Sequence, residues 1–213
     1  MKEESGEWKV ESKKWEGLAG KVVLITGAGK GSGRRLALAF AEYGAIVAAN
    51  DISPINVEEV VAQIQQQGGR AQTFVEDVAK KMGAQGLIKQ VEDEFGRIDV
   101  LVNHAAVQPR VPLLDMDEWD WHRTLDVTLT GAFLMTQSAG RVMRSQGSGV
   151  IINLVTLNQE SAEKEAAFVS AMHGLAAFTH QAARELSPYG VRVHLVETGE
   201  GVVEKVLALL EEI

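Results

Sequence analysis

The sequence predicts an α/β fold: a doubly wound parallel sheet of about six strands, in the order 3-2-1-4-5-6, with helices on both faces. Short apolar runs rich in β-branched residues alternate with longer segments of helical periodicity. A glycine-rich turn joins the first apolar run to the first helical segment. The length of 213 residues and the hydrophobic content of 46% suit one domain with a full core and are too small for two.

The first strand and the turn after it give the strongest indication of function. The run VVLI at residues 22–25 does not alternate with polar residues, as expected of a strand buried on both faces. Gly27, Gly31 and Gly33 follow, and a helix then runs to Gly44. Glycines let the backbone approach a ligand closely, and the first amides of a helix point at an anion. The turn therefore predicts a diphosphate site; a turn that merely connects strand to helix is the alternative.

The rest of the chain repeats the alternation. Ser53 and Pro54 predict a helix start, because a hydroxyl can cap the first turn and proline suits its first position. Asp115 and Glu118 have capping-box spacing and predict the start of a long helix. The other strands are expected at 45–50, 71–76, 98–103, 150–155 and 191–196, and the helices at 54–68, 79–95, 117–144, 161–186 and 201–213. Sites of such sheets lie beyond the carboxyl ends of the strands.

Composition argues against several classes of function. The chain has no cysteine, which excludes disulfides and cysteine-ligated zinc and suggests a reducing compartment. The five histidines lack ligand spacing, so no metal site is expected. A net charge of −8 argues against nucleic-acid binding. Because no apolar run reaches about 18 residues and the N-terminus lacks an apolar signal core, we expect a cytoplasmic protein without a membrane span.

The N-terminal segment differs from the rest of the chain. Residues 1–18 are charged and sparsely apolar, with Trp8 and Trp15 as their large aromatic residues. We expect an extension that is either disordered or held by its tryptophans against the sheet or another subunit. Residues 19–213 are then expected to form a single dinucleotide-binding domain.

An acidic residue ends the second expected strand. Asp51 follows Gly33 by 18 residues, where a carboxylate can accept hydrogen bonds from the adenosine ribose hydroxyls. A 2′-phosphate about 4 Å from it would be opposed by roughly 4 kcal/mol at an effective dielectric constant near 20, before screening. The sequence therefore favours NAD(H) over NADP, although Lys30, Arg34 and Arg35 could offset part of the repulsion. The alternative is that Asp51 only caps its own turn.

The spacing of the turn resembles that of a known family. It lacks the Gly-Lys-Ser/Thr of a phosphate loop and departs from GxGxxG. It reads TGxxxGxG, at Thr26, Gly27, Gly31 and Gly33, and this pattern resembles the short-chain dehydrogenase/reductase family, whose sheet is Rossmann-like. The resemblance implies hydride transfer between a nicotinamide cofactor and a carbonyl or alcohol.

Further stretches match the family in order, from about Leu18 to Gly199. They are DV at 77–78, NHAA at 103–106 in place of NNAG, LDVTLTG at 125–131 and INLVT at 152–156. By this resemblance the cofactor contacts come from Thr26, Gly27, Lys30, Gly31, Ser32, Gly33, Asp51, Ile52, Asp77, Val78, Asn103 and Ala105.

The family's catalytic residues are replaced in this chain. The resemblance implies a tyrosine as general acid/base, a lysine four residues later, a serine and an asparagine; these positions read Phe168, Met172, Thr156 and Thr128. A spacing of four places two side chains on one helical face, where an ammonium can lower the pKa of a phenol. Phenylalanine has no proton to transfer and methionine has no charge. The simple interpretation of both residues is core packing.

Two functions therefore compete. One is an NAD(H)-binding protein of oxidoreductase ancestry with impaired catalysis, serving as a regulatory or structural subunit. The other is an active oxidoreductase with a non-standard proton donor, for which His104 and His173 are weak candidates. The family's Pro-Gly after the sixth strand is Thr198-Gly199 here, and the usual last strand and substrate-covering segment are expected to be missing.

The two longest expected helices, 117–144 and 161–186, carry more apolar surface than one sheet face is expected to cover. We expect a homo-oligomer, a dimer or tetramer, formed through these helices. The sequence names no substrate.

Overall fold

The computed structural model describes residues 16–157 and 163–210 and contains one six-stranded sheet in the order β3-β2-β1-β4-β5-β6. Every neighbouring pair of these strands is parallel. The strands are β1 Val22–Thr26, β2 Ile46–Asn50, β3 Arg70–Phe74, β4 Val100–Asn103, β5 Gly149–Val155 and β6 Val191–Glu197. The predicted fold class and strand order are confirmed. Trp8 and Trp15 lie outside the described residues.

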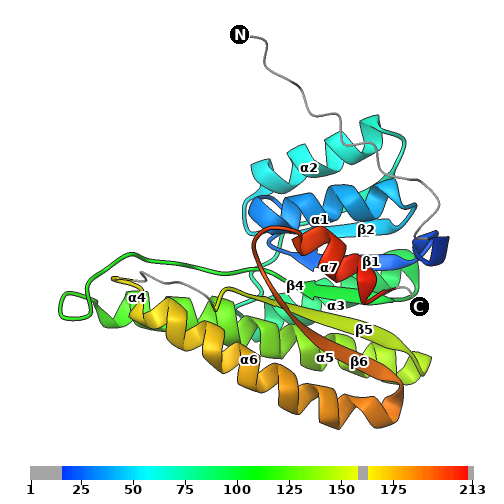
Figure 1. The fold of residues 1–213 in the computed structure, drawn as a ribbon. Coiled ribbons are helices and arrows are strands. Elements are labelled where there is room, and N and C mark those ends of the chain that lie inside the picture. Colours follow the sequence, from blue (N-terminus) through cyan, green and yellow to red (C-terminus); the bar gives the residue numbers. More distant parts are fainter. Residues whose placement is uncertain (1–15, 158–162, 211–213) are drawn as a thin grey trace.

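Helices cover both faces of the sheet (Figure 1). One face is packed by α1 Gly31–Glu42, α2 Pro54–Gln66 and α7 Val202–Ala208. The other is packed by α3 Lys81–Phe95, α5 Gly131–Gln146 and α6 Ala166–Leu186. The short helix α4 Glu118–Leu125 and the loop before it form an arm that projects beyond the sheet. None of the helices among the described residues could cross a membrane.

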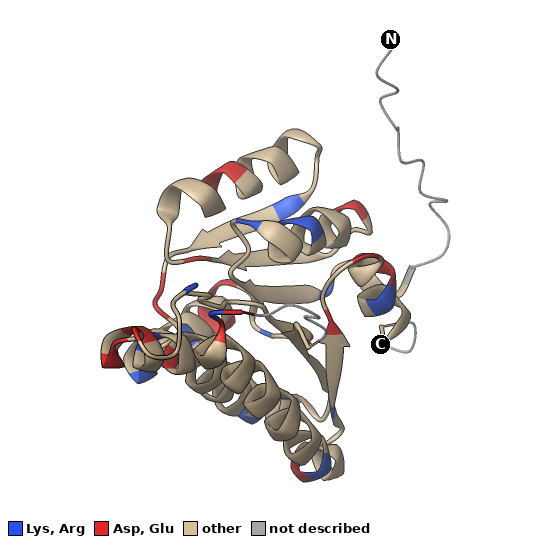
Figure 2. Cartoon of the chain, turned by 60° about the vertical axis from the view of Figure 1, so that its left-hand side comes forward, with Lys and Arg blue, Asp and Glu red and all other residues tan. Residues whose placement is uncertain are grey.

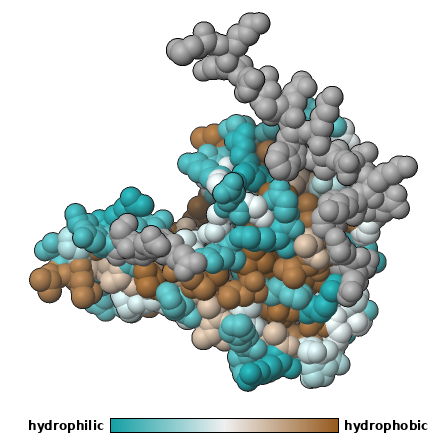
Figure 3. Space-filling model, in the orientation of Figure 1, coloured by the Kyte–Doolittle hydropathy of each residue, from teal (hydrophilic) through white to brown (hydrophobic). Residues whose placement is uncertain are grey.

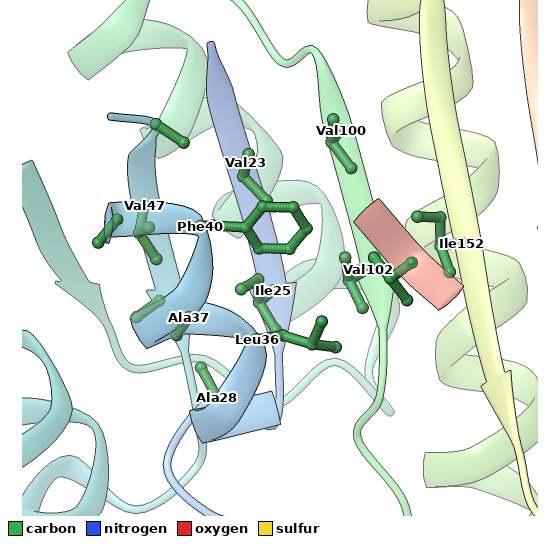
Figure 4. Packing of buried hydrophobic residues seen from close by; sticks show 14 of the residues in the cluster. Val23, Ile25, Ala28, Leu36, Ala37, Phe40, Val47, Val100, Val102 and Ile152 are labelled. Atoms are coloured by element: carbon green, nitrogen blue, oxygen red, sulfur yellow. The ribbon is translucent and has the colours of Figure 1, made fainter. Parts of the chain in front are cut away.

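The helix after the glycine-rich turn is held against the sheet by apolar packing. Phe40 of α1 is fully buried and lies over Val23 and Ile25 of β1 (Figure 4). Burying a phenylalanine contributes about 1.5–3 kcal/mol. Leu36 and Ala37 of the same helix are also fully buried. This packing fixes the N-terminus of α1 just beyond the end of β1, where the candidate site lies.

The predicted helix start at Ser53 and Pro54 is confirmed without its capping hydrogen bond, and the cap predicted at Asp115 is wrong. The side chain of Ser53 makes no capping hydrogen bond at α2; its backbone N–H donates to Asp51 Oδ1 at 2.9 Å, although Pro54 does take the first turn. At α4 the cap is Asp117, which accepts from Asp120 N at 2.8 Å. Asp115 lies two positions upstream of the cap, too far to reach the first amides of the helix, because a capping carboxylate accepts from amides two or three residues later.

The long helix predicted over 117–144 is present but interrupted. A π-helical turn, Asp126–Thr130, separates α4 from α5. Such turns are frequent at functional sites, because the extra residue re-aims side chains and frees backbone groups. The helix predicted over 161–186 begins at Ala166, and residues 161–162 lie outside the described residues. The last helix spans Val202–Ala208 rather than 201–213.

Candidate functional site

Thr26, the last residue of β1, connects this strand to the loop after β4 by hydrogen bonds. Its hydroxyl, in a side chain only 1% exposed, accepts from His104 N at 3.1 Å and from Ala105 N at 3.2 Å. On the other side of the turn, Ala28 N donates to Asn50 O at the end of β2 at 2.8 Å. The three strand ends are therefore tied together around the glycine-rich turn.

The turn leaves no room for side chains. A Cβ on Gly33 would lie 2.3 Å from the carbonyl oxygen of Gly27. Gly27 and Gly31 have φ of +66° and +57°, which other residues rarely adopt. Lys30 precedes α1 without capping its first amides, so no side chain competes for them. A narrow backbone cradle with free amides fits an anion such as the diphosphate of a dinucleotide.

Beside the cradle runs a groove of about 290 Å³. Its walls come from the ends of β1 and β2, the segment after β3, the loop after β4 and the end of α4. The predicted site residues that line it are Gly27, Lys30, Asp51, Ile52, Asp77, Val78 and Ala105. The structure therefore brings most of the predicted cofactor contacts into one groove.

Asp51 lies in this groove at the end of β2. Its Oδ2 accepts from Gly29 N at 3.0 Å and its Oδ1 from Ser53 N at 2.9 Å. It thus shapes the turn, as the alternative interpretation holds. A carboxylate has about four acceptor positions, so two hydrogen bonds leave capacity for ribose hydroxyls.

The basic residues near the turn have separate roles. Lys30 is exposed and lines the groove. Arg34 points toward α2, where it pairs with Glu59 at 3.0 Å, and Arg35 donates to the hydroxyl of Ser32 at 3.0 Å. Figure 2 shows positive and negative residues scattered over the helices. Of the three basic residues, Lys30 is the one that the structure places in the groove.

The loop after β3 and the end of β4 complete the site. Asp77 Oδ1 accepts from Ala79 N at 3.1 Å, and its Oδ2 lies 3.7 Å from Arg123 Nη1. Asn103, 4% exposed, donates to Asn153 Oδ1 at 2.8 Å and to Thr136 Oγ1 at 3.2 Å. Asn103 therefore ties β4 to β5 and α5, while Ala105 reaches the groove.

The positions of the four family catalytic residues lie at the next strand end. Phe168 and Met172, each 4% exposed, belong to one apolar cluster with Ala132, Val155 and Leu175. This packing fits their simple interpretation as core residues.

Met172 and Thr128, two of the four family positions, line the same small cavity of about 10 Å³. Thr128 and Asn103 line it together with Met172. Thr128 is 1% exposed, lies on the π-helical turn and accepts from Val107 N at 3.3 Å.

Thr156 is hydrogen-bonded to Thr198, a residue for which the sequence alone predicted no role. Its hydroxyl lies 2.6 Å from that of Thr198, which follows β6. The backbone N–H of Thr198 donates to Val155 O at 2.7 Å. A threonine where the family pattern has proline was the available signal, since it adds both a hydroxyl and an N–H.

The two histidines considered as proton donors lie elsewhere. The ring of His104 lies under the glycine-rich turn, with Nδ1 3.0 Å from Gly27 O. Burial lowers the pKa of His104, and the hydrogen bond to Gly27 opposes that effect. His173 is exposed on α6 and bonded to Val169 O. Within the described ranges no group of histidine and acidic residues could hold a metal ion.

Comparison with known proteins identifies the fold's relatives. A family model described as short chain dehydrogenase matches residues 21–204. An uncharacterized oxidoreductase of Thermotoga maritima is 38% identical over 194 residues, covering 89% of this chain and 76% of that protein.

Two solved structures are similar throughout the fold. A metagenomic short-chain oxidoreductase in complex with NADP has a TM-score of 0.87 and 28% identity, covering 92% of this chain and 93% of that one. An NAD⁺-bound xylitol dehydrogenase has a TM-score of 0.80 and 31% identity, covering 89% of this chain and 75% of that one. One of these two relatives binds NADP and the other NAD⁺, so the comparison indicates NAD(P) as their cofactor class and favours neither cofactor. By the match of residues 21–204 and the shared fold, this chain belongs to the short-chain dehydrogenase family.

Proposed function

We propose that this protein binds NAD(H) at the glycine-rich turn and transfers hydride slowly or not at all. The observation that carries the proposal is the contrast between an intact cradle and a proton-transfer site made of Phe168 and Met172. Bound NAD(H) would supply or accept the hydride. The amides at the start of α1 would hold the diphosphate, and Asp51 would accept from the ribose.

The buried apolar cluster that contains Phe168 supplies no proton donor. The side chains that share its cluster are Ala132, Val155, Met172 and Leu175, which carry no ionisable group. The Thr128 hydroxyl accepts from Val107 N, and the Thr156 hydroxyl is hydrogen-bonded to that of Thr198. Serine-like hydroxyls can position a substrate oxygen, but at neutral pH they do not act as acids unaided.

The competing proposal is an active oxidoreductase whose proton donor is non-standard. The favouring observation is that Thr156 keeps a hydroxyl at the substrate-binding position and has a second hydroxyl beside it. Assay of NADH consumption with a panel of aldehydes and ketones separates the two proposals. Turnover well above the buffer rate would favour the active enzyme.

We expect the wild-type protein to bind NAD more tightly than NADP because of Asp51. Asp51→Asn keeps an acceptor oxygen for one of the two amides, Gly29 N or Ser53 N, and removes the charge that would face a 2′-phosphate. A repulsion of a few kcal/mol before screening predicts that the ratio of NADP to NAD dissociation constants falls by about tenfold or more. Titration calorimetry with both cofactors measures this ratio.

Glu59→Gln is the control for charge alone, because Glu59, on α2, pairs with Arg34 of α1 and does not line the groove. Its ratio should match the wild type. Tighter binding of NADP than of NAD by the wild type would contradict the role of Asp51.

We also propose that the protein is a homo-oligomer, dimer or tetramer, built through α5 and α6. Phe133 and Phe178 form an edge-to-face ring pair 6.0 Å apart at a groove of about 440 Å³ between these helices. Arg144 lies over the ring of Tyr189 at the same groove. Figure 3 shows hydrophobic side chains along the projecting arm and over the lower helices.

Light scattering should give two or four times the chain mass of 23.1 kDa. Phe133→Glu should shift the mass toward the monomer, because a charge in an apolar interface is costly to bury. Ile55→Glu is the matched control, since Ile55 is 77% exposed on α2 at the opposite face. A monomeric wild type at micromolar concentration would contradict the proposal.

A further inference from the structure

The imidazole of His104 fills the space directly beneath the glycine-rich turn. Its Nδ1 lies 3.0 Å from Gly27 O, and an ideal Cβ on Gly33 would stand 2.6 Å from the same nitrogen. The other ring nitrogen faces the opposite way: Nε2 is 3.8 Å from the Cβ position of Gly31. The ring thus spans the cradle from one glycine to the next, and His104 also lines the adjoining groove.

The backbone of His104 is fixed in this position. Its amide donates to the Thr26 hydroxyl at 3.1 Å, and the next amide, of Ala105, donates to the same oxygen at 3.2 Å. The ring therefore has little freedom to leave the turn. In its neutral form, Nδ1–H donates to Gly27 O, and Nε2 keeps an acceptor lone pair on the Gly31 side. An acceptor is the wrong partner for an anion, whereas a protonated ring would present a second N–H there.

We propose that His104 is a positioning residue that takes up a proton when a dinucleotide diphosphate binds, so that cofactor affinity depends on pH. The inference rests on the proposed NAD(H)-binding function. The charged groups that act on the ring are Asp51, after β2, which favours the protonated form, and Arg35, on α1, which opposes it. Lys30 also lines the groove. The ends of β1 and β4 contribute the Gly27 carbonyl and the Thr26 hydroxyl.

The direction of the pH effect follows from proton linkage. In the free protein, burial lowers the pKa of His104, so the ring is neutral at pH 7. A bound diphosphate stabilises the charged ring and raises its pKa, so the complex holds more protons than its separate components. Affinity must then fall as pH rises. An increase of about one pKa unit on binding changes the dissociation constant by at most about tenfold between the low-pH and high-pH limits, so we expect a several-fold higher dissociation constant at pH 8 than at pH 5.5.

The test is calorimetric titration of the full chain with NAD⁺ between pH 5.5 and pH 8, for the wild type and for His104→Asn. Asparagine can still donate to Gly27 O but does not titrate, and it is the residue that the family pattern has at this position. We expect the variant to bind NAD⁺ at pH 8 within about threefold of the wild type and to lose the pH dependence. A merely structural role would change the affinity equally at every pH.

His173→Asn is the matched control, because His173 is exposed on α6, and this variant should keep the full pH dependence. Adenosine, which lacks the diphosphate, should bind the wild type without pH dependence. Binding of NAD⁺ with the same affinity at every pH would overturn the role of His104 and leave the proposed function standing. No binding of NAD⁺ at any pH would overturn both.

Discussion

Phe168→Tyr combined with Met172→Lys should reduce carbonyls with NADH at least about 100-fold faster than the wild type, since one general acid/base typically contributes 10² to 10⁴ in rate. The two positions lie one helical turn apart on α6 and belong to one buried cluster. A lysine four residues after a tyrosine places an ammonium beside the phenol, which lowers the phenol pKa toward neutrality. The variant therefore restores a proton donor and the charge that activates it.

The single variants should do much less, because groups that act as a unit fail together. Phe168→Tyr alone keeps an unassisted phenol with a pKa near 10. Lysine at position 172 is feasible because Met172 shares its small cavity with Thr128 and with Asn103, whose buried Oδ1 has no hydrogen-bond partner. An ammonium there has polar oxygen atoms along its cavity wall. Adding Thr128→Asn and Thr156→Ser should raise the rate further.

The matched control is Phe168→Tyr with Met172→Gln, which has a polar side chain of similar length and no charge. It should stay near the single tyrosine variant. Steady-state NADH consumption over the carbonyl panel measures all of these rates. Robust turnover by the wild type, unchanged in Thr156→Ala, would show that the chemistry is located elsewhere.

Gly33→Ala should abolish most dinucleotide binding and destabilise the fold. The new Cβ would stand 2.3 Å from Gly27 O and 2.6 Å from His104 Nδ1. The backbone of Gly27 cannot move away at low energetic cost, and overpacking typically costs about 1–3 kcal/mol. Because the turn must open to relieve the contact, the amides of α1 lose their arrangement, and each 1.4 kcal/mol lost from binding is about a tenfold rise in the dissociation constant.

Gly86→Ala is the control for this change. Gly86 lies in α3, and the closest atom to its Cβ position is 3.8 Å away. Alanine there should stabilise the helix by up to about 1 kcal/mol and leave NAD binding unchanged. Urea unfolding and calorimetry report the two quantities. Unaltered NAD affinity in Gly33→Ala would mean that the dinucleotide does not bind at this turn.

The strands and the turn could be predicted because their signals are local. The unbroken apolar run of β1 and the positive-φ glycines after it encode their own structure. Asp51 could be placed because the carboxyl ends of parallel strands meet at one edge of a sheet. The family resemblance then added the collinear stretches up to Thr156, which the sheet brings to that edge.

The features that escaped prediction depend on contacts between distant residues. The hydroxyls of Thr156 and Thr198 meet across 42 residues, through the pairing of β5 with β6. Ser53 occupies the N-cap position of α2 without a side-chain capping bond, and its backbone N–H donates to Asp51. The π-helical turn that contains Thr128 has no distinctive composition. One extra residue shifts the apolar face of a helix only locally, and a short sequence window does not detect that shift.

We propose that cofactor binding survives in this protein although the family's proton-transfer residues are replaced. The most direct test follows the fluorescence of NADH bound to the wild-type protein before and after addition of the carbonyl panel. We predict saturable binding of NADH and, after the carbonyls are added, a signal that does not decay faster than in buffer alone. Rapid loss of the bound NADH signal, or no binding at millimolar NADH, would contradict the claim.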